Sequence, residues 1–474
     1  MTRPRILQTP AALILFLLDT VLAVTAWPMV LWLARFDGGN PWDMRALIYP
    51  PANLLLLYAM GLYRREAIVE QRQAMARVPW VVGMGAVLAL GFSVLPPRLA
   101  PGMAAHDFRD EMLVCALAVA CFTVCASVAR LVLEILLRRR VPRRRLLVMG
   151  AGARAWDLLH MLTREGVSPR YDITFLHDPA LGSLDPRLEH GPEGHGPESA
   201  ILRAGSLSVL DAARRAGADQ IVIAPDDRRG MDLRQLLACK KAGFPVVQYL
   251  SFVEHEIRRV DIKRMDLGWM VFSDGFHFGA LDRFLKRVFD LAVSLIMLIL
   301  TAPLVLLGIL AIRLEGPGPV FYRQERVTLD GIVFRILKLR TMRVDAEAGG
   351  AVWAAQSDTR ITRAGLFLRR ARIDELPQLI NILRGEMSFV GPRPERPIFV
   401  EELAAQIPLY RERHMVKAGL TGWAQVNYPY GASVDDARSK LSYDLYYVKN
   451  FSVLFDVAIL LQTLRVVLWP SGVR

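Results

Sequence analysis

The sequence is poor in cysteine, and its N-terminal stretch lacks a small-residue cleavage site. Its 474 residues include four cysteines, of which three lie in one apolar run and Cys239 stands alone in a more polar stretch. So few thiols, without metal-ligand spacing, exclude a disulfide framework, and we expect all four to be structural. The first apolar stretch is too long for the hydrophobic part of a signal peptide, and no small-residue cleavage site follows it. We therefore expect it to be retained.

Polar residues are also scarce. The chain is 53% hydrophobic with a mean hydropathy of +0.28, which predicts membrane segments beside water-soluble parts, and its length predicts two or three domains. The net charge is +13. Such a surplus can serve nucleic acid, anionic lipid or phosphate-bearing substrates. In a membrane protein, however, an excess of arginine and lysine in cytoplasmic loops is the simplest cause, and we predict no nucleic-acid partner.

Long apolar runs are frequent before residue 140. Each of four can cross a ~30 Å hydrocarbon core, and they cover residues 11–34, 46–62, 79–95 and 112–137. Arginines gather before the first run, between the second and third, and after the fourth. The positive-inside rule then predicts a four-helix transmembrane bundle over residues 1–140, with both ends in the cytoplasm. Asp19 inside the first run is either a functional acid or a helix–helix hydrogen-bond partner.

Residues 141–275 have the pattern of a Rossmann-like α/β domain. Buried strands are predicted at residues 146–150, 220–224 and 244–250, and helical patterns alternate with them, as in a parallel sheet. A segment rich in glycine and proline, residues 182–200, predicts a surface loop.

A short glycine turn follows the first of these strands. Gly150 and Gly152 open a helix there, which is the context of a dinucleotide site and also of a plain strand-to-helix turn. Asp178 lies beyond the next strand, beside a proline, so it is no clear ribose-binding acid, and we find no Tyr-x-x-x-Lys pair. Gly150 and Gly152 are therefore weak cofactor-binding candidates.

A fifth apolar run covers residues 291–312 and has Pro303 near its middle. Basic residues flank both of its ends. A simple span would carry everything downstream out of the cytoplasm, away from nucleotide-activated substrates. Because proline removes a backbone donor and bends a helix, we predict a re-entrant helix over about residues 288–313, with Pro303 at its break. A kinked span is the rival interpretation.

The densest polar motifs follow in residues 276–474. Asp374 and Glu375 precede a leucine, a proline and an amphipathic stretch, so they can be an ordinary helix cap. The same geometry lets two carboxylates converge beside a helix start, where one can bind Mg²⁺ and the other can attack phosphorus. Arg393 stands between two prolines, and a guanidinium held in this way suits phosphate.

Three further segments allow two interpretations each. Lys338 lies in a stretch of apolar and basic residues that is a half-buried strand or a phosphate-facing one. Gln425 lies in a glycine-bounded turn with a tryptophan, which is a membrane-interface anchor or a substrate loop. Asp444 stands among aromatic residues and alone says little. Residues 454–468 predict an amphipathic helix on the membrane surface.

Together these motifs resemble the bacterial sugar transferase family, the monotopic phosphoglycosyl transferases that act on polyprenyl phosphate. The matching segments cover about 200 residues in the family's order: GPGPVFYRQER, residues 334–342 and 362–369, DELPQL, SFVGPRP, GLTGWAQV and YDLYYVKN. The bundle and the α/β domain resemble the large members that prime exopolysaccharide or O-antigen repeat units, closest to those of exosortase-type loci. One departure is Ala418, where the family usually has proline.

The resemblance implies a membrane protein with an α/β catalytic domain in residues 276–474, facing the cytoplasm of the bacterial inner membrane. It implies that a UDP-sugar binds together with Mg²⁺, that Glu375 is a ligand of this ion, and that Asp374 attacks the β-phosphorus of the sugar donor. Undecaprenyl phosphate from the membrane lipid then takes the sugar phosphate. Phosphate or substrate contacts are implied for Lys338, Arg340, Arg369, Arg393, Gln425 and Asp444. Large relatives imply a homodimer, and downstream glycosyltransferases are conceivable partners.

Two other functions remain open from the sequence. Membrane-bound nucleotide-sugar dehydratases or epimerases also place a four-span bundle before a Rossmann domain, but they need a full glycine fingerprint and a catalytic Tyr–Lys pair. A non-enzymatic scaffold for polysaccharide assembly would use the Asp374–Glu375 pair only as a cap. The hexose is not identified by the sequence, and glucose and galactose are expected by resemblance alone.

Overall fold

The computed structural model describes most of the chain as two compact units. It covers residues 10–33, 44–59, 62, 81, 117–118, 120–132, 143–190, 199–205, 207–229, 231–265, 267–276, 279–344, 346, 360–428, 431 and 433–468. The first unit contains residues 1–139, 275–440 and 450–474, and the second contains residues 140–274 and 441–449. The second unit is therefore built from two separate pieces of sequence.

A five-stranded parallel sheet forms the centre of the second unit, in the order β3-β2-β1-β4-β5. The strands are β1 (Arg144–Met149), β2 (Tyr171–His177), β3 (Ser199–Arg203), β4 (Gln220–Ile223) and β5 (Val246–Gln248). The helices are α7 (Ala153–Arg164), α8 (Arg187–His190), α9 (Val209–Arg215), α10 (Leu233–Lys241), α11 (Tyr249–Ile257) and α12 (Leu267–Phe272). The unit thus has the parallel sheet with alternating helices that the sequence predicted.

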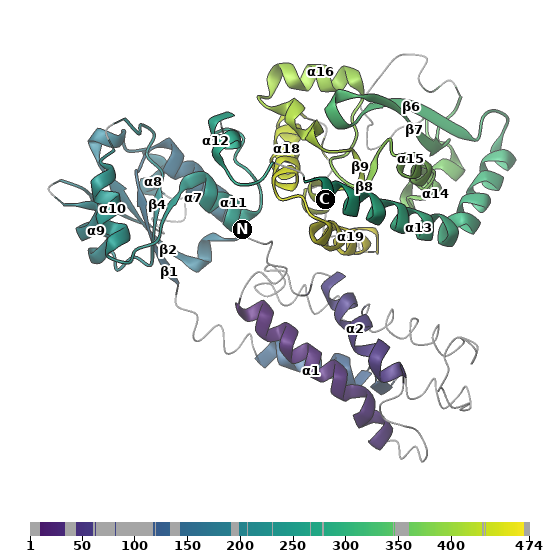
Figure 1. The fold of residues 1–474 in the computed structure, drawn as a ribbon, viewed down its shortest axis with the longest axis horizontal. Coiled ribbons are helices and arrows are strands. Elements are labelled where there is room, and N and C mark those ends of the chain that lie inside the picture. Colours follow the sequence, from purple (N-terminus) through teal and green to yellow (C-terminus); the bar gives the residue numbers. More distant parts are fainter. Residues whose placement is uncertain are drawn as a thin grey trace. The chain divides into compact units, whose positions relative to one another are not determined.

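Side chains on β1 alternate between two cores, as a strand buried on both faces requires. Leu146 and Val148 pack with α7 and α11, whereas Leu147 and Met149 pack with α9 and α10. Figure 1 shows these two helix pairs on opposite sides of the sheet. Cys239 is fully buried in the second core, which supports a structural role for this thiol.

Several predicted boundaries in this unit were wrong. The strand predicted at residues 244–250 ends at Gln248, because Tyr249 begins α11 and is fully buried, with its hydroxyl 2.7 Å from Asp261. The predicted loop at residues 182–200 contains α8 and the first residues of β3. Residues 191–198 lie outside the described part of the chain.

The last turns of one C-terminal helix complete the second unit. Helix α18 (Val434–Lys449) contributes its residues 441–449. The Ser442 carbonyl accepts from the Val260 amide at 3.0 Å, and the Lys449 ammonium lies 2.6 Å from Glu254 and 4.1 Å from the centre of the Trp269 ring. A segment distant in sequence is thus bound by backbone, charge and aromatic contacts.

The C-terminal part of the first unit combines two small sheets with helices. Strands β6 (Phe321–Val327) and β7 (Val333–Leu339) are antiparallel, and β8 (Ser388–Val390) pairs in parallel with β9 (Gly419–Thr421). The helices are α13 (Ala280–Glu315), α14 (Arg363–Arg370), α15 (Gln378–Arg384), α16 (Pro397–Gln406), α17 (Trp423–Asn427) and α19 (Val453–Leu468), with 3₁₀ turns η4 (Leu329–Gly331), η5 (Ile373–Glu375) and η6 (Tyr410–Met415).

Helix α13 is attached to one small region at both of its ends. The Arg287 guanidinium donates to the Leu383 carbonyl at 2.7 Å. Near the other end, a Cβ placed on Gly308 would lie 3.5 Å from the Ile373 side chain. The apolar side chains between these points are largely exposed. Figure 1 shows that the ribbon of α13 curves between the two attachments.

Pro303 lies inside α13 and does not end it, because the helix is continuous from Ala280 to Glu315. The predicted break is therefore no stretch of non-helical chain. Proline removes one backbone hydrogen bond from a helix, and the helix accommodates this loss by bending at the proline. Among the described residues, α13 is the helix long and apolar enough to cross a membrane.

Part of the predicted membrane bundle is visible. Runs one and two form α1 (Pro10–Leu33) and α2 (Met44–Ala59), and Ala120–Val132 of the fourth run is helical. Nearly all of the third run lies outside the described residues, so the four-helix arrangement stays a prediction. Asp19 is fully buried and forms an ion pair with the buried Arg130 at 2.8 and 3.1 Å, which joins the first run to the fourth.

The Asp19–Arg130 pair is expected to hold these helices together. Asp19→Ala removes the carboxylate that balances a buried guanidinium and should destabilise the protein by about 3–5 kcal/mol. Thermal unfolding in detergent measures the loss, and the swap Asp19→Arg with Arg130→Asp should recover part of it. Thr25→Ala on the exposed side of α1 is the control. Equal melting of Asp19→Ala and wild type would contradict a structural role for the pair.

Candidate active site

Asp374 and Glu375 lie in a 3₁₀ turn rather than at a helix cap. Turn η5 follows Arg372, which has a left-handed backbone (φ 58°). Helix α15 begins only at Gln378, and neither carboxylate caps it through its side chain. The capping interpretation is therefore wrong for this pair. A left-handed arginine costs about 1 kcal/mol or more, so the surrounding contacts must hold this turn in place.

Glu375 is the centre of a buried ionic cluster. Its Oε1 lies 3.0 Å from the Lys338 ammonium and 3.1 Å from the Arg393 guanidinium, and its Oε2 lies 3.4 Å from Arg372. Its side chain is 12% exposed, and that of Lys338 is 20% exposed. Strand β7, turn η5 and the Gly-Pro-Arg-Pro turn therefore meet at one carboxylate. The sequence singled out these residues for contacts with phosphate and Mg²⁺, and that role stays a prediction.

The two neighbouring carboxyl groups have opposite pKa shifts. Burial raises the pKa of Asp374 to about 6, and the adjacent charge of Glu375 adds to this, against the pull of nearby cations. Burial also acts to raise the pKa of Glu375, but the three cations around it outweigh burial and hold that pKa well below its ordinary value. Glu375 is thus a fixed anion, whereas Asp374 ionises at about pH 6.

Close packing of glycines positions Arg393. The Gly391 amide donates to the Thr421 carbonyl at 2.9 Å, and the Gly419 amide donates to the Pro392 carbonyl at 2.8 Å. A Cβ on Gly419 would lie 2.1 Å from the Gly391 nitrogen, so neither strand tolerates a side chain here. The Gly-Leu-Thr-Gly segment, predicted as a substrate loop or an anchor, therefore supports the arginine turn.

Two arginines beside this turn escaped the sequence analysis. Arg326 donates to the Pro394 carbonyl at 2.9 Å, and Arg413 donates to the Arg393 carbonyl at 3.0 Å. Burial lowers the pKa of the Arg326 guanidinium, and Arg393 lowers it further, against the pull of Glu395. The available signal was the position of Arg326 in GPGPVFYRQER, but nothing in the sequence marked Arg413.

The other predicted contact residues are more scattered. Arg369 donates to the Thr341 hydroxyl at 2.8 Å and lowers the pKa of Asp374 through its charge, so it belongs to the site's surroundings. Arg340 donates to the carbonyls of Pro317 and Gly316 instead of a carboxylate. Gln425 donates to the Leu420 carbonyl at 3.3 Å. Asp444 is buried on α18, in the segment that belongs to the second unit.

A magnesium ion would find a small donor set here. In the described part of the chain, no group of three or more His, Cys, Asp or Glu side chains is arranged to hold a metal. Two adjacent carboxylates nevertheless fit Mg²⁺, because this ion commonly takes one or two carboxylates and completes its shell with water and substrate phosphates. Glu375 would have to loosen a contact with Lys338 or Arg393 to serve as a ligand.

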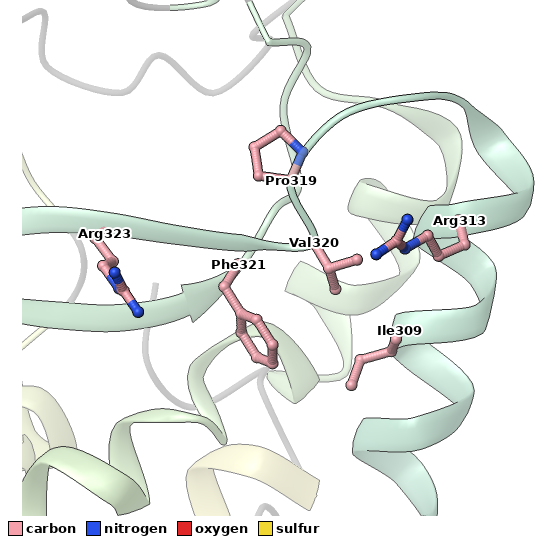
Figure 2. A pocket seen from close by; sticks show the side chains of 6 residues that line it. All are labelled: Ile309, Arg313, Pro319, Val320, Phe321 and Arg323. Carbon is pink, nitrogen blue, oxygen red and sulfur yellow. The ribbon is translucent and has the colours of Figure 1, made fainter.

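A hollow of about 480 Å³ lies elsewhere, where α13 ends and β6 begins. Its lining is Ile309, Arg313, Pro319, Val320, Phe321 and Arg323. Figure 2 shows the two arginines among these apolar side chains. None of the predicted catalytic or phosphate-binding residues lines it, so the hollow is separate from the Glu375 cluster.

The glycine turn of the α/β unit is closed by an internal contact. Gly150 has φ +110°, and α7 begins just after Gly152. The amides of Ala153 and Arg154 both donate to the carboxylate of Asp226. The weak cofactor candidates therefore lie beside a carboxylate of the chain itself.

Comparison with known proteins identifies the family of this chain. Residues 281–470 match the family model described as "Bacterial sugar transferase". A UDP-glucose:undecaprenyl-phosphate glucose-1-phosphate transferase of Caulobacter vibrioides is 44% identical over 180 residues, 38% of this chain and 67% of that protein. The exopolysaccharide production protein PSS of Rhizobium leguminosarum is 40% identical over 192 residues, 39% of this chain and 94% of that protein.

A third relative extends the similarity over a longer segment. It is a UDP-N-acetylgalactosamine-undecaprenyl-phosphate N-acetylgalactosaminephosphotransferase of Aeromonas hydrophila, 41% identical over 252 residues. The match covers 52% of this chain and 58% of that relative. The chain belongs to the bacterial sugar transferase family, as its motifs predicted.

The raised pKa of Asp374 predicts an acid limit to activity. If the ionised carboxylate is the reactive form, kcat should fall about tenfold per pH unit below pH 6, where Asp374 is protonated. Arg372 favours the ionised form, so Arg372→Gln should move this limit to higher pH while rates at pH 8 stay within about twofold. Arg370→Gln, on the exposed end of α14, is the control. Identical profiles for Arg372→Gln and wild type would contradict the assignment.

Proposed function

We propose that this protein moves a hexose 1-phosphate from a UDP-sugar to undecaprenyl phosphate and so starts a polysaccharide repeat unit. The observation that carries the proposal is Asp374, a buried carboxylate of raised pKa, beside the Lys338–Glu375–Arg393 cluster. A nucleophile next to fixed cations is what transfer of a phosphoryl group requires. The names of the relatives support the same donor and acceptor classes.

The chemistry proceeds in two displacements at one phosphorus. An Asp374 carboxylate oxygen attacks the β-phosphorus of the donor, and the bond to the bridging oxygen breaks, so UMP leaves with the electron pair. The sugar phosphate is then an acyl phosphate on Asp374. A phosphate oxygen of undecaprenyl phosphate attacks the same phosphorus and releases the free carboxylate. Neither step needs a proton transfer, and the two substrates need not meet.

The cations around Glu375 suit the changing charge of this reaction. Lys338 and Arg393 form ion pairs with Glu375, the residue after Asp374, and their side chains can turn toward phosphoryl oxygens when a donor binds. Arg369 acts on Asp374 from the end of α14. Glu375 would hold Mg²⁺ together with the donor phosphates, and the ion would neutralise part of the charge on the leaving group.

The contacts of α13 favour a re-entrant helix over a span. Its attachments, at Arg287 and Gly308, are to Leu383 and Ile373. Those two residues are separated by ten positions of helical chain, which extend at most about 20 Å. A span would have to place them on opposite sides of a ~30 Å core. The catalytic part therefore lies on one side, which we assign to the cytoplasm because UDP-sugars are there.

The alternatives have less support. A dehydratase or epimerase would need an open dinucleotide site, whereas the amides of Ala153 and Arg154 are bonded to Asp226. A scaffold would use Asp374 and Glu375 only as a cap, and they do not cap α15. The homodimer, the downstream glycosyltransferases and the identity of the hexose remain predictions from resemblance.

The nucleophile assignment is tested by covalent trapping. Purified protein is incubated with Mg²⁺ and UDP-sugars labelled with ³²P at the β-phosphorus, first glucose, galactose and N-acetylgalactosamine. Wild type should retain label on the protein until undecaprenyl phosphate is added. Asp374→Asn should retain none and lose transfer at least ~10³-fold. Asp330→Asn in the exposed hairpin turn should match wild type. Equal transfer by Asp374→Asn would end the proposal.

The topology of α13 is tested by cysteine labelling. In a variant without native cysteines, Arg283→Cys and Arg313→Cys should both react with an impermeant maleimide from the cytoplasmic side, and Ile299→Cys should be protected by lipid. A kinked span predicts that one of the two end positions reacts only from the periplasmic side. That result would also move the catalytic part away from its donor.

A further inference from the structure

The α/β unit has a ligand position that its topology defines independently of any motif. In the order β3-β2-β1-β4-β5, the chain proceeds outward in one direction from β1 and in the other from β4. Sheets of this kind bind ligands outside the carboxyl ends of the strands where the order reverses, here between β1 and β4. The Gly150–Gly152 turn follows β1, and the loop starting at Ala224 follows β4.

That position already holds an anion, and the anion belongs to the chain. Asp226, two residues into the loop after β4, accepts from the Ala153 amide at 2.7 Å through Oδ2 and from the Arg154 amide at 2.9 Å through Oδ1. These are the free amides of the first turn of α7, which in dinucleotide-binding proteins face a pyrophosphate. One carboxylate satisfies both of them.

The glycines of the turn serve this internal contact. A Cβ on Gly152 would lie 2.0 Å from Asp226 Oδ2, and a Cβ on Gly150 would lie 2.7 Å from the Ala224 carbonyl oxygen. The absence of a side chain at Gly152 therefore lets a carboxylate approach the backbone closely, as the same glycine lets a phosphate do in nucleotide-binding proteins. The glycine pattern is explained without any cofactor.

The surrounding charge also favours a resident anion. Burial lowers the pKa of the Arg154 guanidinium, and the charges of Arg228 and Arg264 lower it further, whereas Asp226 opposes them. Arg264 is itself bonded to Asp157 at 2.6 Å, so its charge is balanced. Asp226 is the carboxylate among these groups that also reaches the helix amides.

We infer that Asp226 is the built-in occupant of the phosphate position of the α/β unit, and that the unit is closed to dinucleotides and to free pyrophosphate. The loop after β4 binds the first turn of α7 through this carboxylate, and the contact holds the two segments together at the edge of the sheet where a cofactor would enter. The unit thus acts as a packing scaffold, and its glycine turn is part of its own fold. This inference does not depend on the proposed transferase activity.

Hydrogen exchange on the full-length protein in detergent tests the contact. Asp226→Ala should speed exchange of the amides in residues 151–158 about fivefold or more, as expected for loss of hydrogen bonds to a charged group. Asp227→Asn, on the same loop, is the matched control and should leave these amides unchanged. Exchange that is equal in Asp226→Ala and wild type would show that the carboxylate does not occupy the position in solution.

Ligand titration tests the closure. Wild type should show no change in melting temperature, and no change in exchange at residues 151–158, with NAD⁺ or pyrophosphate up to millimolar concentration. Protection of these amides, or a rise in melting temperature, with either probe in wild type would overturn the inference. Both readouts are independent of sugar transfer, so their outcome stands whether or not the proposed function holds.

Discussion

The Glu375 carboxylate is the contact on which the candidate site depends. It joins a cation from β7 and a cation from the Gly-Pro-Arg-Pro turn, which are distant in sequence, to the left-handed Arg372 three residues before it. Without these partners a carboxylate with so little exposure would be too costly to keep ionised. Burial and the charge of Glu375 raise the pKa of its neighbour Asp374, and nearby cations such as Lys338 oppose them, so that Asp374 ionises at about pH 6.

Sequence predicted the broad fold because hydrophobic periodicity records burial. The alternation of Leu146 to Met149 between two cores is such a record, and α19 appeared where an amphipathic stretch was expected. The strand predicted at residues 244–250 was too long at its end. A buried tyrosine such as Tyr249 is compatible with a strand or a helix, and its packing in the core determines which one forms. Local pattern cannot distinguish these cases.

The sequence singled out residues by their type, but it did not indicate their partners. Lys338, Glu375 and Arg393 do meet, whereas Arg340 binds the carbonyls of Gly316 and Pro317. Which cation turns toward a carboxylate depends on strand face and on loop geometry, and these arise from distant contacts. For the same reason the sequence did not indicate Arg413 or Asp226. The partner of Arg413 lies 20 positions away, and the two partners of Asp226 lie 72 and 73 positions away.

The division of α18 between the two units has a consequence for biogenesis. Buried positions such as Leu445 and Val448 belong with the α/β unit, although they are synthesised about 200 residues after its last strand. At about 5–20 residues per second, the ribosome needs on the order of ten to forty seconds to supply them. During that interval the nascent α/β unit lacks residues 441–449, so its completion waits for the C-terminal end of the chain.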